Sequence, residues 1–191
     1  MKIVWTFLYR QEWRLVVKEK ETLINTSSVI SDVNLVAMDY ARQHAAELVG
    51  MKWYDGEPGT GPSEKWAISE STRKMLREII TEAFSCETPM SVLAERIREA
   101  GGFSAERARL IAETEVKLAQ SRGNLEAWKK TGVVKSIKWL LSSLHYDRDE
   151  CDLNHEAGAI PLGQIFPSGV PAPPAHIGCR CSACIAELNE P

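Results

Sequence analysis

The stretch SAERARLIAETEVKLAQSRGNLEAWKKTG, residues 104–132, is the longest periodic run in the sequence and predicts its central helix, over 104–130. Ser104 can cap the first turn, and Thr131-Gly132 supplies an end. Between them, apolar and small polar residues recur at alternating steps of three and four, as expected for one helix face: Ile111, Thr114, Leu118, Ser121, Leu125 and Trp128. We interpret the run as a core-facing helix, with a partner-binding seam as the alternative.

Three further helices are predicted upstream of this run. Residues 89–100 follow Thr88 as N-cap, carry Pro89 in the first turn and end at Gly101-Gly102. Residues 65–86 repeat apolar side chains at steps of three and four, and residues 32–49 lie between an Asp32 cap and a Gly50 stop. Glycine and proline in 50–64 indicate a linker between an N-terminal segment, 1–60, and a second domain, 65–191.

Downstream of the central run the pattern changes. Residues 133–144, VVKSIKWLLSSL, are rich in β-branched and apolar residues and predict a strand. The rest of the Cys/His-containing tail, residues 145–184, is proline-rich and shows no helical period, so something other than a hydrophobic core must hold it. The sequence therefore predicts a mostly α protein with a small α+β C-terminal module. In this prediction a helical domain is followed by a strand or hairpin and a proline-rich loop region pinned by Cys and His, and this tail spans residues 133–184.

The chain is weakly acidic, with 23 Lys and Arg against 26 Asp and Glu and a net charge of −3. Residues 145–191 alone hold two basic and seven acidic residues, a net charge of −5. This balance argues against broad electrostatic binding to DNA or to an anionic membrane. The apolar opening is interrupted at Arg10, well short of the roughly 20 residues that a membrane span needs. We expect a cytosolic protein without a signal peptide.

Histidine and cysteine gather in the tail, above all in PAPPAHIGCRCSAC, residues 171–184. Zinc prefers four tetrahedral nitrogen or sulfur ligands, usually as short-spaced pairs separated by a loop. His176 and Cys179 form such a pair, and five cysteines in a reducing compartment favour metal over disulfides. The spacing predicts a structural zinc site of Cys151, His176, Cys179 and Cys181, with His145, His155 or Cys184 as substitutes.

The sequence also allows these cysteine and histidine residues to have roles other than structural zinc ligands. The thiols can remain free in a proline-pinned loop, or Cys151 can form a disulfide with Cys179 or Cys181. A Cys/His nucleophile is disfavoured, since the acidic neighbours predict a raised thiol pKa. A catalytic zinc would need a general base, for which Glu150 or Glu156 could be nominated.

Six short motifs follow one another in the second half of the chain: RARLIAETE (107–115), TGVVKSIKWL (131–140), DECDLN (149–154), AGAIPLG (157–163), FPSG (166–169) and PPAHIGCRC (173–181). In this order they resemble the phage Mu protein F-like minor head proteins, the phage head morphogenesis family, from about Ile68 to Cys181. By this resemblance His176, Cys179 and Cys181 match the family's terminal motif, and Cys151 matches the last thiol of its upstream Cys-x2-Cys. Arg148 replaces the first thiol of that pair, and Glu113 stands where arginine is common.

The resemblance implies a minor structural protein of a tailed phage or prophage, not an enzyme. Such proteins act near the portal in head assembly and, in some phages, in DNA packaging or ejection. The implied partners are the portal protein, the major capsid or scaffold protein and phage DNA in the head, with no membrane and no small-molecule substrate. The implied location is the virion, and the host cytoplasm during assembly. A zinc-containing nucleic-acid-binding or interaction module is the alternative, and a Cys/His or zinc-dependent hydrolase or toxin a third.

Overall fold

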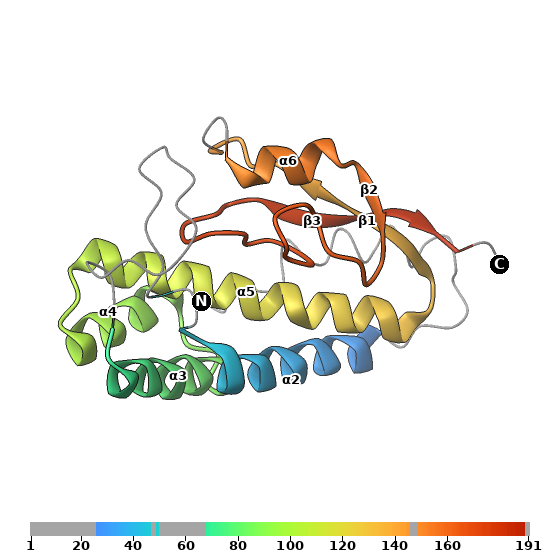
Figure 1. Cartoon of the computed structure of the whole chain (residues 1–191). Coiled ribbons are helices and arrows are strands. Elements are labelled where there is room, and N and C mark those ends of the chain that lie inside the picture. The colour runs from blue at the N-terminus through green and yellow to red at the C-terminus, as the bar shows by residue number, and fades with distance from the viewer. Residues whose placement is uncertain (1–25, 47–48, 50–67, 146–148, 190–191) are drawn as a thin grey trace.

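One long helix separates a layer of helices from a small sheet (Figure 1). The computed structural model describes residues 26–46, 49, 68–145 and 149–189. It confirms the predicted class, mostly α with a small α+β module in the C-terminal part. No helix of this described part is long and apolar enough to cross a membrane. The elements are α2 (Thr26–His44), α3 (Glu70–Ser85), α4 (Met90–Gly101), α5 (Ala105–Thr131), β1 (Val134–Leu140), α6 (Glu150–Glu156), β2 (Ala159–Pro161) and β3 (Ser182–Leu188).

Helix α5 begins and ends within one residue of its predicted bounds. The Ser104 side chain accepts a hydrogen bond from the Arg107 N–H at 3.3 Å, and Gly132 ends the helix in the left-handed region at φ 65°. Its buried residues extend well beyond the predicted stripe and divide between two cores. Ile111 and Val116 pack with the other helices, whereas Trp128 packs under the sheet. A helix covered on several faces is a core helix, in agreement with the core-facing interpretation.

The helical core is built from residues spaced three and four apart on each helix. Leu76 and Ile80 of α3 and Leu93 and Ile97 of α4 are almost completely buried. Helix α2 and the residue directly after it contribute small side chains at a spacing of four, which allow the helix to approach closely: Ala37, Ala41 and Ala45. The described part of the N-terminal segment therefore shares one core with α3, α4 and α5.

The predicted bounds of α2, 32–49, are wrong at both ends. The helix begins six residues before Asp32, at Thr26, and ends at His44. Ala46 has a left-handed backbone, φ 68°, which stops the helix. Two arginines of α3 bind backbone carbonyl groups just after the end of α2: Arg77 Nε donates to Ala45 O at 3.0 Å, and Arg73 donates to Ala46 O. Because these contacts join residues far apart in the sequence, a local pattern does not predict them. The predicted stop at Gly50 lies outside the described residues.

Smaller corrections apply at three other boundaries. Helix α3 begins at Glu70, not 65, because the Ser69 side chain caps it by accepting the Thr72 N–H at 3.1 Å. Pro89, not Thr88, occupies the N-cap position of α4. The Thr88 N–H is instead bonded to Ala83 O at 2.9 Å, which closes the end of α3. The strand is shorter than 133–144 and stops at Leu140.

The sheet has the order β2-β1-β3, with both neighbours antiparallel to the central strand β1. Ile137 of β1 lies opposite Ile160 of β2 and Ile185 of β3. Trp139, also on β1, is fully buried and packs against Phe166 in a T-shaped arrangement, with ring centroids 5.1 Å apart. This aromatic pair anchors the connection from β2 to β3, which covers residues 162–181 without a helix or strand.

No residue range was predicted for α6, β2 or β3. Helix α6 has only seven residues and needs a complete capping box to form. Strand β2 has three residues, and β3 is half-buried on both faces, so neither shows clear alternation.

Truncating Phe166 should destabilise the protein. We expect Phe166→Ala to lower the free energy of unfolding by about 3–5 kcal/mol, because its buried ring fills the space beside Trp139. The neighbouring Ile165 is 64% exposed, so Ile165→Ala is a matched control expected to change stability by less than about 0.5 kcal/mol. Urea unfolding of both variants measures the difference, and equal effects would contradict the described packing.

Candidate metal centre

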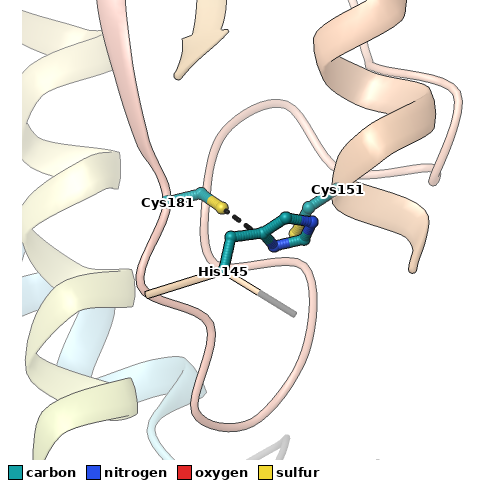
Figure 2. A group of neighbouring side chains, drawn as sticks. All are labelled: His145, Cys151 and Cys181. Carbon is teal, nitrogen blue, oxygen red and sulfur yellow. Dashed lines mark hydrogen bonds between the residues drawn. The ribbon is translucent and has the colours of Figure 1, made fainter. Parts of the chain in front are cut away.

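Three separate segments bring cysteine and histidine side chains together beside α5. Cys151 comes from α6, and His145 from the turn after β1. His176, Cys179 and Cys181 come from the segment that leads into β3. Figure 2 shows His145 lying between Cys181 and Cys151.

The start of α6 fixes the position of Cys151. The Asp149 side chain accepts the Cys151 N–H at 2.7 Å, and the Asp152 side chain accepts the Asp149 N–H at 2.9 Å. This reciprocal capping box satisfies the open N–H groups of a helix too short to be stable alone. It orders the first turn of α6, so Cys151 points inward and is fully buried.

Helix α5 holds the segment that carries His176, Cys179 and Cys181. Thr114 Oγ1 accepts the Gly178 N–H at 3.0 Å, and Lys117 Nζ donates to Cys179 O at 3.4 Å. Gly178 has φ +76°, and a Cβ there would lie 3.5 Å from Leu110 Cδ2. The left-handed backbone therefore favours glycine, and the segment lies directly against α5.

The ligand atoms form two overlapping groups that share Cys151. One contains His145, Cys151 and Cys181, the other Cys151, His176 and Cys179, and within each group the atoms lie within 4.8 Å of one another. Cys151 Sγ and Cys179 Sγ are 3.6 Å apart, and Cys181 Sγ lies 3.9 Å from His145 Nδ1. These groups lie close enough to hold a metal ion.

All four residues of the predicted site therefore fall in these groups, and His145 joins them. The other two substitutes are placed differently. Nδ1 of His155 faces Trp139 O at 2.9 Å, and Cys184 lies on β3 opposite Lys138. Cys151, Cys179 and Cys181 are not joined by a disulfide, so the disulfide alternative is not formed.

The thiols strongly perturb one another. Hydrogen bonds from Cys151 and Cys181 lower the pKa of Cys179 despite its burial, while the hydrogen bond to Cys179 raises the pKa of Cys151. Burial by itself lowers the pKa of His176, but its hydrogen bond with Cys179 and the charge of that thiol raise it to about 9. The expectation that acidic neighbours raise the thiol pKa values is thus wrong for Cys179, because its nearest groups are thiols and an imidazole.

Burial limits what this cluster can do. The three clustered cysteines, Cys151, Cys179 and Cys181, are at most 5% exposed, so a substrate has little access to their sulfur atoms. A lowered pKa favours the thiolate over the thiol, and the thiolate is the form that binds metals. The arrangement therefore suits a buried metal better than a nucleophile.

Sequence reasoning missed the supporting residues. The sequence pattern predicts Thr114 only as part of a helix stripe, and it predicts no role for Lys117, Asp149 or Asp152. A signal for the last two exists, because Asp149 and Asp152 have the spacing of a capping box. The contacts of Thr114 and Lys117 cross more than 60 residues of sequence, so local patterns do not reveal them.

Comparison of the chain with protein-family models, with curated proteins and with solved structures finds no match. The resemblance to the phage Mu protein F-like proteins stays a prediction from the motifs.

Removing the Thr114 hydroxyl should loosen the ligand-bearing segment. We expect Thr114→Val to destabilise the protein by about 1–3 kcal/mol, because the half-buried Gly178 N–H loses its acceptor while the side-chain volume hardly changes. Thr114→Ser keeps a hydroxyl and should cost less. Chemical denaturation of the two variants gives the comparison, and a Ser variant as unstable as the Val variant would show that the hydrogen bond is unimportant.

Proposed function

We propose that this chain is a minor head morphogenesis protein of a tailed phage or prophage, in which a structural zinc ion fastens the C-terminal module to α5. The observation that carries the proposal is the convergence of separate motifs on one site. RARLIAETE supplies Thr114, DECDLN supplies Cys151 with its helix cap, and PPAHIGCRC supplies three further candidate ligands.

A fourth motif supports the same arrangement from outside the ligand set. In FPSG, Phe166 packs on Trp139, and the Ser168 N–H donates to Asn154 Oδ1 at 2.9 Å. Asn154 is the last residue of DECDLN and is completely buried. The motifs on which the resemblance depends are thus parts of one packed unit.

The chemistry of the donors favours zinc. Bond lengths of about 2.3 Å to sulfur and about 2.0–2.1 Å to nitrogen place tetrahedral sulfurs about 3.8 Å apart, and sulfur and nitrogen about 3.6 Å apart. The observed separations are 3.6 Å between Cys151 Sγ and Cys179 Sγ and 3.9 Å between Cys181 Sγ and His145 Nδ1. Three thiols with one imidazole make a set typical of structural zinc, and hard cations prefer oxygen.

Burial favours a structural over a catalytic role for the metal. A catalytic zinc keeps an open position for water or substrate, whereas this site offers five buried or largely buried donors for four positions. The segment 145–191, with its net charge of −5, also suits protein partners better than DNA. The portal, the major capsid protein or the scaffold are therefore the proposed contacts in the head.

Metal binding should be stoichiometric and should stabilise the fold. We expect native mass spectrometry of reduced protein to find one zinc per chain, removed by a chelator together with several kcal/mol of stability, because metal binding is part of the folding free energy. Cys179→Ser should abolish binding, whereas Cys86→Ser, at an exposed position on the end of α3, should not. Zero metal in the wild-type protein with unchanged stability after chelation would refute the zinc clamp.

The assembly role is tested in the phage or prophage that encodes the chain. We expect gene deletion to reduce the yield of intact heads in electron micrographs, because a head morphogenesis protein acts during assembly. Mass spectrometry of purified wild-type particles should find the chain in them.

Normal heads after deletion, with no copy of the chain in particles, would refute this role. Salt-dependent retention of the purified protein on DNA would favour the nucleic-acid-binding alternative instead.

A further inference from the structure

The proposed metal centre needs a positive charge beside it. Three thiolates carry three negative charges, a zinc ion carries two positive ones, and an imidazole ligand is neutral. One negative charge is therefore left over at a buried centre, where a charge without a partner is costly. This requirement rests on the proposed zinc site.

The second histidine does not supply the missing charge. Both rings face the carboxylate of Asp149, which lies 3.7 Å from His145 Nε2 and 3.2 Å from His176 Nε2. The Asp149 side chain is only 1% exposed and is itself negative. A protonated imidazole left outside the ligand set would therefore balance this carboxylate and leave the charge of the thiolates unmatched.

The side chain of Lys117 reaches the cluster from α5. Its Nζ donates to Cys179 O at 3.4 Å, and Thr114, one helical turn earlier, accepts the N–H of the preceding residue, Gly178. In Figure 1 the segment that leads into β3 lies along α5. Few covalent bonds separate the carbonyl oxygen of a cysteine from its sulfur, so Lys117 Nζ lies within about 8 Å of Cys179 Sγ.

The surroundings of Lys117 make its charge effective at the thiols. The side chain is half-buried, and within the described part of the chain it forms no ion pair with a carboxylate. Burial lowers the pKa of Lys117, and the charges of Cys179, Cys181 and Cys151 raise it. The three clustered thiolates are therefore anionic partners of this ammonium group, and salt and water screen a half-buried interaction less than one at the surface.

Arg180 provides a comparison within the same segment. It lies between Cys179 and Cys181 in the sequence, but its side chain is exposed. Water and salt screen an exposed charge, so closeness in sequence gives Arg180 little influence on the buried sulfur atoms. Of these two cations, the one on α5 is the better placed.

We propose that Lys117 is the counter-cation of the metal centre, and that its ammonium group couples metal binding to the attachment of the C-terminal module to α5. The contact with the Cys179 carbonyl brings the positive charge to the thiolates, and the metal-loaded cluster in turn holds the lysine. By thermodynamic linkage, Lys117 strengthens metal binding by the same factor as the metal strengthens the contact of Lys117. Lys117 thus supports the metal without being a ligand.

Three substitutions separate the charge of Lys117 from its hydrogen bond. Lys117→Gln keeps an N–H donor without the charge, Lys117→Met removes both, and Lys117→Arg keeps both. The four side chains have similar helix propensities, so α5 is expected to form in each variant. Arg180→Gln is the matched control, because it removes one positive charge at an exposed position of the same segment.

Zinc affinity, measured by chelator competition, is the first readout. We expect Lys117→Gln and Lys117→Met to weaken zinc binding about ten- to hundredfold, in the range seen for supporting residues around metal sites. Lys117→Arg and Arg180→Gln should stay close to the wild-type affinity. Thermal unfolding of the zinc-free protein should be nearly the same in all variants, because fewer thiolates are present without a metal to bind them.

The cobalt-substituted protein gives a second readout, which a purely structural role of Lys117 would not change. Removing a nearby cation raises the energy of the sulfur electrons. The thiolate-to-cobalt charge-transfer band should therefore move to longer wavelength in Lys117→Gln, and should stay in place in Lys117→Arg and Arg180→Gln.

Wild-type zinc affinity in Lys117→Gln would overturn the proposal, because the hydrogen bond alone would then explain the contact. An equal loss of affinity in Arg180→Gln would also overturn it, since that is the result of a general effect of positive charge. Absence of zinc from the wild-type protein would overturn the metal centre itself, and is thereby distinguished from a wrong role for Lys117.

Discussion

The meeting of three thiols and two imidazoles beside α5 is the contact on which the C-terminal module depends. Cys151 and Cys179 are 28 positions apart in sequence, yet their sulfurs lie 3.6 Å apart. Between them runs most of the connection from β2 to β3, which has no helix or strand of its own. So long a connection rarely keeps one conformation in a compact domain without a specific anchor. Here Phe166, the Asn154–Ser168 contact and the thiol cluster anchor it at successive points.

Helix α5 connects the anchored segment to the rest of the protein, because it contacts both the helical core and the sheet. Its first half packs into the helical core through Ile111 and Val116, and its last turns pack under the sheet through Leu125 and Trp128. In the same stretch of α5 as Ile111 and Val116, the side chains of Thr114 and Lys117 hold the cysteine-bearing segment. A metal bound in the cluster would therefore fix the sheet and α6 to the helical layer as well as to each other. In the proposed head protein, such a module would meet its partners as a preformed surface, at little cost in conformational entropy.

The sequence predicted the features that depend on neighbours along the chain. The caps of α5 at Ser104 and Gly132, the spacing of Leu93 and Ile97, and the strand around Ile137 all follow from local rules. The candidate ligands also followed, because metal donors are few in kind and closely spaced. Features set by distant contacts were missed, such as the end of α2, whose carbonyl groups are bound by arginines of α3. Helix α6 was also missed, although its capping box is a local signal, because seven residues are too few to show a helical period.

Hydrogen–deuterium exchange with and without a metal chelator tests the central claim most directly, since it reports where stability is lost. The account predicts that chelation speeds exchange at Gly178, at Cys151 and throughout α6, while the buried turns of α3 and α4 stay protected. Unchanged exchange around Gly178 and Cys151 would contradict it, and would mean that packing alone holds the C-terminal module.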